Sequence, residues 1–502
     1  TKQDVVDWAN KYLGPESYAI IYKREGKDPD EQKIAAPKIT PIVTNRDSQS
    51  EFLSEIQTSQ VQPIEPVFVD YKKDMSQFEA QPGIDVLYKK NETNDIFTLI
   101  YVFNTGTEND PALNLAFNYL SYLGTDKMTA EEIASEMYDI ACSFYMNAGA
   151  NQSSIQITGL SENMGKAMEI VEGLIAGAKP DEAILENCKA DMLKSRADAK
   201  LNQSRCFGAL QRYLFYGGDF IRRTTLTDPA LQALTSEQLL AKIGGLMGKQ
   251  HEVLYYGPQK EAEVKSALAE HHKVAADLQP LEKKFSTLLP TDANKVVLAQ
   301  YDAKQLYYLQ FSNRGEKFDV AADPEITLYN EYFGGGMNTI VFQEMREARG
   351  LAYTAWATLA TPSNANGDYS YYAFIATQND KMQKAVEAFD DIINNMPESE
   401  KAFGIAKEAL VSRLRTERTV KDGVLWSYLR ARDLGLDAPR DKQILEKVQS
   451  MTLDDVKAAQ QKWVKGRKYV YGILGDIQDL DLNYLKTLGP IQTVSQEEIF
   501  GY

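Results

Sequence analysis

Two copies of one α+β domain are predicted from the length of the chain, an internal repeat and a mixture of strand-like and helical segments. The chain has 502 residues, more than one hydrophobic core of ordinary size holds. We expect each copy to be a two-layer domain, in which a mixed, antiparallel-rich sheet carries helices on one face.

The composition is that of a globular protein and argues against several classes of function. Hydrophobic residues make up 43% and charged residues 25% of the chain. No apolar stretch approaches the roughly 18 residues that a transmembrane helix needs, so membrane insertion is not expected. A net charge of -16 argues against binding to nucleic acid, which needs clustered lysine and arginine. The three cysteines form no C-x-x-C pair, so neither a disulfide framework nor a cysteine zinc site is indicated.

A long repeat organises the chain. A capped helix, a short polar turn and an apolar strand follow Thr452, and the same order follows Thr235, about 217 residues upstream. Two helical segments align on Ala167 and Ala385 with nearly the same offset, about 218 residues. Two full repeats are therefore predicted.

Residues 1–26 match only the closing helix and strand of such a repeat. One helix and one strand cannot bury their own apolar faces, so we expect the chain to begin inside a longer parent protein. Prolines separated by polar residues then indicate an interdomain connector, namely Pro37, Pro41, Pro63 and Pro66. The predicted division is 1–66 for the truncated repeat and hinge, 67–283 for the first full domain and 284–502 for the second.

Strand-like and helical segments are mixed within each repeat. β-branched and aromatic residues predict strands at 97–103, 153–158, 252–256, 305–311 and 369–375. Helical spacing of apolar residues predicts helices at 111–123, 129–141, 161–177, 323–333, 379–395 and 398–418.

The most informative segment runs from residue 333 to residue 375. It opens with three glycines, Gly334–Gly336, where glycine allows a positive φ and a close backbone approach. A helix over 338–349 is predicted next, with Arg346 on its polar side, and Tyr353 follows at the start of a strand. From these residues alone, surface charge on an amphipathic helix is the simpler interpretation.

The pattern of this segment, G-G-G-M-N-x-x-x-F-Q-E-x-R-E-x-R-G-L-A-Y, resembles the even-numbered domains of the pitrilysin, insulysin and mitochondrial-processing-peptidase superfamily. The resemblance covers nearly the whole chain and implies the end of a second domain followed by a third and a fourth. In that family two halves enclose a chamber, and an Arg and a Tyr at this spacing reach the substrate from the C-terminal half. The resemblance therefore implies that Arg346 and Tyr353 contact the substrate backbone and the developing oxyanion, to which both can donate hydrogen bonds.

The zinc motif of that family, H-x-x-E-H, is degenerate in the first full domain. The motif supplies two His ligands on one helix face with a Glu base between them. Counted back from Gly124, the corresponding positions are Leu115, Asn118 and Tyr119. These side chains cannot bind zinc or activate water. The resemblance thus implies no metal or other cofactor in this chain, and zinc in a missing N-terminal half.

The three histidines do not restore a metal site. His251 begins the pattern H-E-x-x-Y on a predicted strand, where the i, i+4 geometry of a helix is absent. His271 ends the pattern A-x-x-E-H, and we expect it to lie with His272 on an exposed helix end. No G-x-S-x-G pattern for a serine nucleophile is present.

Tyrosine is abundant, with 28 in the chain. Packing within the sheets is the favoured interpretation for most of them. The strand that begins at Tyr369 is also a candidate wall for an extended peptide.

The first functional hypothesis is a C-terminal, non-catalytic half of a zinc metalloendopeptidase, which closes the proteolytic chamber and binds unfolded peptides. Its implied partner is an N-terminal catalytic half or a separate catalytic subunit. Two alternatives stay open: a stand-alone inactive subunit that captures peptides for a catalytic partner, and a structural core subunit. The compartment is also open, since bacterial periplasm and cytoplasm are both compatible with the sequence.

Overall fold

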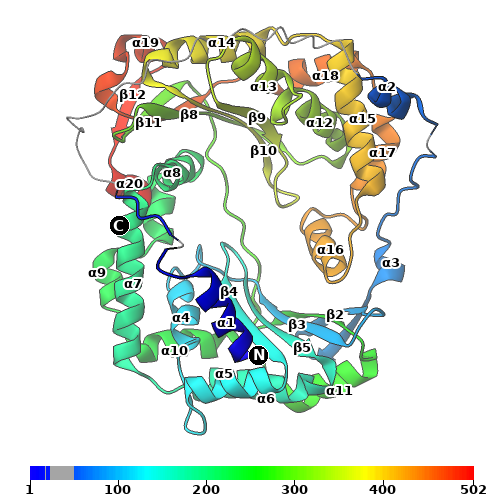
Figure 1. Ribbon diagram of the computed structural model, residues 1–502, viewed down its shortest axis with the longest axis vertical. Coiled ribbons are helices and arrows are strands. Elements are labelled where there is room, and N and C mark those ends of the chain that lie inside the picture. The colour runs from blue at the N-terminus through cyan, green and yellow to red at the C-terminus, as the bar shows by residue number, and fades with distance from the viewer. Residues whose placement is uncertain (17, 23–49, 61) are drawn as a thin grey trace. The chain divides into compact units, whose positions relative to one another are not determined.

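The structure is a computed structural model that forms two compact units, Thr1–Pro63 and Ile64–Tyr502 (Figure 1). The residues that it describes are 1–16, 18–22, 50–60 and 62–502.

The first unit contains two helices, α1 (Lys2–Tyr12) and α2 (Glu51–Thr58). None of the α1 residues is buried. The helix expected within residues 1–26 is confirmed, whereas the strand expected after it does not form among the described residues of this unit. Pro37 and Pro41 of the predicted connector lie outside the described residues.

Two mixed six-stranded sheets form the framework of the second unit, with the orders β1-β2-β6-β3-β5-β4 and β12-β7-β11-β8-β10-β9. The strands of the first sheet are β1 (Ser76–Gln81), β2 (Ile84–Lys90), β3 (Ile96–Phe103), β4 (Cys142–Ala148), β5 (Ser153–Leu160) and β6 (His251–Gly257). Those of the second sheet are β7 (Lys295–Gln300), β8 (Gln305–Lys317), β9 (Thr354–Ala360), β10 (Asp368–Gln378), β11 (Val470–Gly475) and β12 (Ile491–Val494). The predicted α+β class with two mixed sheets is confirmed.

Helices connect the strands in both repeats, and short 3₁₀ and π-helical turns carry the label η. The first repeat contains α3 (Tyr71–Asp74), α4 (Leu113–Leu120), α5 (Ala130–Asp139), η1 (Ser161–Asn163), α6 (Met164–Gly177), α7 (Glu182–Lys200), α8 (Gln203–Thr224), α9 (Asp228–Gln232), α10 (Ser236–Leu246) and α11 (Glu261–His271). The second contains η2 (Val320–Ala322), α12 (Asp323–Tyr329), η3 (Asn330–Gly334), α13 (Ile340–Phe342), η4 (Gln343–Ala348), η5 (Asn379–Lys381), α14 (Met382–Asn394), α15 (Glu400–Thr416), α16 (Gly423–Asp433), α17 (Asp441–Val448), α18 (Leu453–Ala459), η6 (Gln460–Val464), η7 (Ile477–Asp479), α19 (Leu482–Leu488) and α20 (Gln496–Phe500). Within the described ranges, no helix combines the length and apolar character required to cross a bilayer.

The repeat seen in the sequence is visible in the structure. Thr235 and Thr452 cap α10 and α18 through capping boxes with Gln238 and Asp455. The strand after each helix, β6 or β11, occupies the third position of its sheet. Each of these strands pairs parallel with one neighbour and antiparallel with the other. The predicted boundaries at residues 66 and 283 stay a prediction.

The helices of each repeat cover one face of their own sheet. In the first repeat Leu115 of α4 and Val171 of α6 belong to the buried cluster beneath the first sheet. In the second repeat Phe389 of α14 and Val456 of α18 do the same beneath the second sheet. The helical layer expected on one face of each sheet is therefore present.

The other face of the second sheet is covered by α8, a helix of the first repeat (Figure 1). Leu210 and Leu214 of α8 are buried against Leu309 and Leu474 of the sheet. The approach is close at Gly472 of β11, where an added Cβ would lie 2.3 Å from a methyl carbon of Leu214. Glycine leaves room for Leu214 at this crossing, and a side chain at 472 would force Leu214 to move.

The first sheet receives the matching contribution from the second repeat. The face of the first sheet that its own helices leave uncovered contacts α16. Leu425 and Leu429 of α16 are buried there with Leu87 and Ile100 of the sheet. Each repeat thus contributes one helix to the sheet of the other repeat. Each sheet therefore has helices packed on both of its faces. The sequence patterns did not show this exchange, because an apolar helix face does not reveal which sheet it covers.

Ion pairs support the exchanged α16. Arg432, near the end of this helix, donates from Nη2 to Glu252 Oε2 of β6 at 2.8 Å. Asp433 accepts from Lys283 Nζ at 2.5 Å. Glu252 is only 8% exposed, so its carboxylate depends on Arg432 for compensation.

A substitution on α16 should destabilise the first sheet, although the helix belongs to the second repeat. Leu425→Ala removes a fully buried side chain and should lower the free energy of unfolding by about 2–5 kcal/mol. Hydrogen exchange should accelerate at β2 and β3 more than at β10. The control is Val420→Ala, since Val420 is 59% exposed and its truncation should change little. Unchanged exchange in β2 and β3 with Leu425→Ala would refute the proposed dependence.

Candidate functional site

The residues singled out by sequence lie in a loop, an irregular helix and the start of an edge strand of the second sheet. Gly334 ends η3, α13 and the π-helical turn η4 follow, and Gly350 ends the helical segment with a φ of 57°. Met345, which is fully buried, anchors η4 in the core. A π-helical turn widens the helix and is common at functional positions.

The three glycines serve one of the two roles expected for them. None of Gly334–Gly336 has a positive φ, so that expectation is wrong. The close approach is confirmed, because an added Cβ on Gly334 would lie 2.9 Å from the carbonyl oxygen of Ala357. Glycine is needed here because η3 lies against the edge of β9, where a Cβ would strike the strand backbone.

Arg346 and Tyr353, predicted as a pair, lie together in the structure. The guanidinium carbon of Arg346 is 4.5 Å from the ring centre of Tyr353 and 4.9 Å from that of Phe342. Such stacking holds the guanidinium plane by cation–π attraction while its edges can still donate hydrogen bonds. Tyr353 is 71% exposed. The pair therefore presents hydrogen-bond donors on a fixed, solvent-facing platform.

The neighbouring Arg349 has a structural role and serves as a comparison for Arg346. Arg349 is held by two carboxylates, Glu344 at 3.4 Å and Asp391 at 3.3 Å. The ion pair recorded for Arg346 within the described chain is with Glu347, and its Nε–Oε1 distance of 3.6 Å is long. Arg346 thus retains more donor capacity than Arg349.

The degenerate zinc positions on α4 do not fit a metal. Leu115 is buried among apolar side chains, and Asn118, about one turn further along the helix, is exposed. Tyr119 is buried, and its hydroxyl donates to Ser236 Oγ at 2.9 Å and accepts from the Asp181 backbone amide at 2.8 Å. An apolar side chain, an amide pointing to solvent and an occupied phenol offer no ligand set for zinc.

The second repeat carries an equivalent tyrosine that sequence reasoning missed. Tyr332 donates to the carbonyl oxygen of Pro397 at 2.8 Å and accepts from the amide of Ser399 at 3.1 Å. Ser399 caps α15 as Asp181 caps α7. In both repeats the phenol thus ties the first helix to the N-terminus of a later one.

The histidines form a buried network instead of a metal site. His251 lies on β6, as predicted, and is 4% exposed. His272 is also 4% exposed, so the expectation that it lies on an exposed helix end is wrong. The chain folds back after α11 and places His272 against Glu172 of α6, at 2.6 Å from Nδ1 to Oε1. His271, the last residue of α11, stays at the rim beside Glu169.

Hydrogen bonds account for every polar atom in this network. His251 donates from Nδ1 to the carbonyl oxygen of Lys249 at 2.8 Å, so its Nε2 is free to accept from His272 Nε2 at 2.9 Å. Glu172 also accepts from Tyr101 at 2.8 Å and from the Lys273 amide at 2.7 Å. Within the described residues, no group of three or more His, Cys, Asp or Glu side chains is arranged to hold a metal ion.

The strand that begins at Tyr369 packs one face into the core, whereas Ser370 and Tyr372 on its other face line a surface cavity, so its role as a wall stays a prediction. Tyr369 and Tyr371 are fully buried within β10. Because β10 lies between β8 and β9, it has no free edge for an added strand. Packing, the favoured interpretation of these tyrosines, is confirmed.

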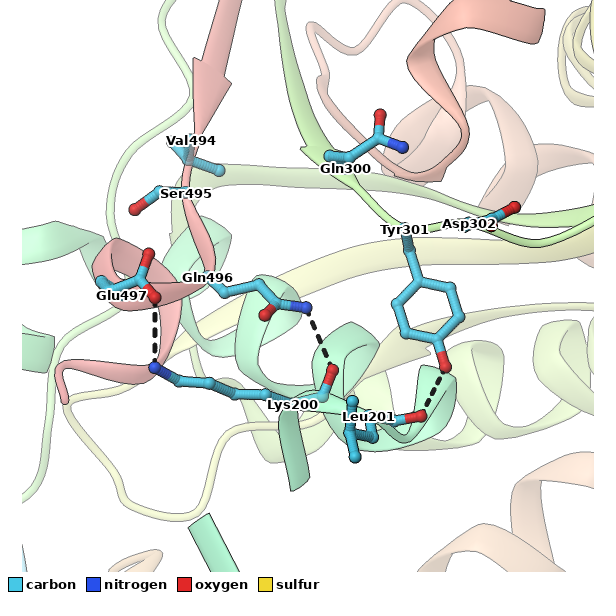
Figure 2. A pocket seen from close by; sticks show the side chains of 9 residues that line it. All are labelled: Lys200, Leu201, Gln300, Tyr301, Asp302, Val494, Ser495, Gln496 and Glu497. Carbon is cyan, nitrogen blue, oxygen red and sulfur yellow. Dashed lines mark hydrogen bonds and ion pairs between the residues drawn. The ribbon is translucent and has the colours of Figure 1, made fainter. Parts of the chain in front are cut away.

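A large surface cavity lies elsewhere, where the two repeats meet (Figure 2). Its volume is about 580 Å³, and its polar groups are joined across the junction. Lys200 pairs with Glu497 at 3.2 Å, and Tyr301 donates to the carbonyl oxygen of Leu201 at 2.7 Å. These bonds link α7 to the second repeat, so the cavity belongs to the joint between repeats.

Comparisons with known proteins agree with this arrangement. Residues 250–410 match the family described as the peptidase M16 inactive domain. The matched part of the chain is thus similar to the inactive domain of M16, or pitrilysin-family, peptidases. An uncharacterised zinc protease of Streptomyces coelicolor is 21% identical over 398 residues, which are 74% of this chain and 82% of that protein.

Solved structures share the M16 fold. The peptidase M16 inactive domain of Pseudomonas fluorescens matches with a TM-score of 0.63 and 18% identity, over 80% of this chain and 98% of that one. The ferredoxin protease FusC, solved in complex with Arabidopsis ferredoxin, matches with a TM-score of 0.63 and 14% identity. The match covers 95% of this chain and 50% of FusC, so this chain spans about half the length of that protease.

The buried histidine network should make the first repeat sensitive to acid. Burial, followed by the nearby His272, lowers the pKa of His251 to about 4 from about 6.5 in an unfolded chain. The unfolded chain therefore binds a proton first as pH falls, and the folded state should lose about 3 kcal/mol between pH 6.5 and 4. This contribution is fully present above pH 6.5.

NMR titration of the His251 ring checks the pKa directly, and urea unfolding at several pH values checks the stability. A His251 signal that titrates near pH 6.5 in the folded protein would contradict the assignment.

Proposed function

We propose that this chain is the non-catalytic half of a zinc metalloendopeptidase, which binds unfolded peptide and closes the proteolytic chamber. The observation that carries the proposal is the exposed platform of Arg346 stacked on Tyr353 at 4.5 Å. The M16 match and the likeness to proteases of about twice this length support it.

The platform suits a peptide carbonyl. A guanidinium held over a ring donates hydrogen bonds in a fixed plane, and the phenol of Tyr353 can add another donor. Donors placed where an oxygen gains negative charge stabilise the transition state more than the ground state. Met337, which is 73% exposed in the preceding loop, offers adaptable apolar contact for side chains of the peptide.

The catalytic metal is proposed to reside in a partner half, on the same or a separate polypeptide. The α4 residues that replace the zinc motif are engaged in packing and in hydrogen bonds within this chain. What this chain contributes is the binding and orientation of the peptide. Stand-alone capture subunits and structural core subunits are the competing possibilities, and the variants below distinguish a structural subunit from a peptide-binding one.

Arg346→Ala in the protein assembled with its catalytic half should lower kcat/KM by about 10²–10³-fold, similar to the loss of one oxyanion donor. Tyr353→Phe, which removes only the hydroxyl, should lower kcat/KM in the same direction. Arg349→Ala is the matched control, because Arg349 is held by Glu344 and Asp391 and should not touch the peptide. The measurement is hydrolysis of a fluorogenic peptide. Undiminished kcat/KM in Arg346→Ala would refute the role and favour a structural subunit.

The chain of 502 residues alone should hydrolyse no peptide, because the side chains at Leu115, Asn118 and Tyr119 neither bind zinc nor activate water. The purified chain is mixed with the same fluorogenic peptide, with and without a chelator. Hydrolysis that a chelator abolishes would show that the metal site has been assigned to the wrong half.

A further inference from the structure

The outermost strand of the first sheet, β4, pairs with β5 on one side only. Antiparallel partners exchange hydrogen bonds at every second residue. The amide of Leu160 donates to Ala141 and the amide of Gly149 donates to Gln152, so the odd-numbered residues of β4 face β5. The N–H and C=O groups of Phe144 and Met146 therefore point away from the sheet.

Nothing in the described part of the chain satisfies these outward groups. No recorded backbone or side-chain hydrogen bond involves the main chain of Phe144 or Met146 apart from the β4–β5 ladder. The corresponding edge of the second sheet is different. There the side chain of Asn330 bonds both the amide and the carbonyl oxygen of Leu359 at 2.9 Å, and Gly334 lies against Ala357.

The two edges occupy equivalent places in the repeats. Tyr119 and Tyr332 each accept a hydrogen bond from the backbone amide of the residue that caps a later helix, so they mark equivalent positions on α4 and η3. Asn330 lies two residues before Tyr332, and Phe117 lies two residues before Tyr119. The side chain of Phe117 has no amide group, so it cannot bond a strand edge as Asn330 does. The first repeat therefore lacks the side chain that closes the edge in the second repeat.

The remaining edges carry protective features that β4 lacks. β1 contains a register shift beside Glu79, and β12 is only four residues long. Bulges, charges, prolines and short length all discourage strand addition. β4 reads CSFYMNA over seven residues, with no charged residue and no proline. It is thus the described edge best suited to accept another strand.

The side chains of β4 indicate what that strand should look like. Phe144 and Met146 are half-buried and pack toward the core of the first repeat, whereas Tyr145 is 65% exposed on the other face. Residues of an added strand that share the face of Phe144 and Met146 would meet apolar surface. Residues on the face of Tyr145 would meet solvent.

We propose that the β4 edge binds an extended segment of the peptide substrate by strand addition, with apolar side chains at alternate positions. The main chain of Phe144 and Met146 supplies the hydrogen bonds, and their side chains favour apolar neighbours. The proposal rests on the proposed peptide-binding function and adds a second contact, distinct from Arg346 and Tyr353, that holds the chain without regard to charge.

The test uses the full chain and a fluorescein-labelled peptide of alternating valine and threonine, with one lysine and one glutamate at its ends. Met146→Pro removes the outward N–H and should weaken binding by about tenfold or more. Met146→Ala removes the same side chain but keeps the N–H, and should bind within about threefold of the native chain. Equal affinity of the two variants would overturn the proposal.

Two further measurements use the native chain and so do not depend on the folding of a proline variant. Hydrogen exchange at the Phe144 and Met146 amides should be fast without peptide and should slow when the peptide is added. The same peptide N-methylated at every residue should not slow it. Slow exchange before peptide is added, or no change after it, would overturn the proposal.

Failure of this proposal is distinguishable from failure of the proposed function. Arg346→Ala should leave the peptide-induced protection of the Phe144 and Met146 amides unchanged. A loss of activity when Arg346→Ala is assembled with the catalytic half, without any protection at β4, would refute strand addition alone. Protection at β4 with full activity in Arg346→Ala would refute the Arg346 role alone.

Discussion

The architecture depends on the need to cover both faces of each sheet. The helices that belong to a repeat bury one face, and the second face carries leucine, isoleucine and phenylalanine as well. A soluble fold cannot leave such a face in water, because apolar area costs free energy in proportion to its exposure. The exchange of α8 and α16 meets this need, and the two repeats therefore stabilise each other. The glycine at 472 and the buried pair of Glu252 with Arg432 are both consequences of the same crossing helices.

Duplication has let the two copies diverge at equivalent places. Tyr119 and Tyr332 stand at matching positions of the first helix and hold the N-terminus of a later helix. Two residues earlier the copies differ, because Asn330 closes a sheet edge and Phe117 does not. The residue at this position thus packs in the core of one copy and caps a sheet edge in the other.

The proposed function depends on which polar groups are left without a strong internal partner. Arg349, His272 and Glu252 are all satisfied within the fold, and they stabilise it. The guanidinium of Arg346, in contrast, stacks on the ring of Tyr353, and its ion pair with Glu347 is long. Groups with spare hydrogen-bonding capacity at the surface are the ones that a ligand can use. The same difference distinguishes the two edge strands β4 and β9. Asn330 bonds the outer edge of β9, whereas no described residue bonds the outer edge of β4.

The sequence by itself determined the α+β class, the two repeats and most of the strands and helices that it predicted. These follow from local spacing, since amphipathic periods and helix caps depend on neighbours in the chain. Only the tertiary structure decided that α8 and α16 cross between repeats, that His272 is buried, and that Gly334 needs space and not a positive φ. Those outcomes depend on which surfaces meet across hundreds of residues, and no periodicity in the chain encodes the identity of a distant partner.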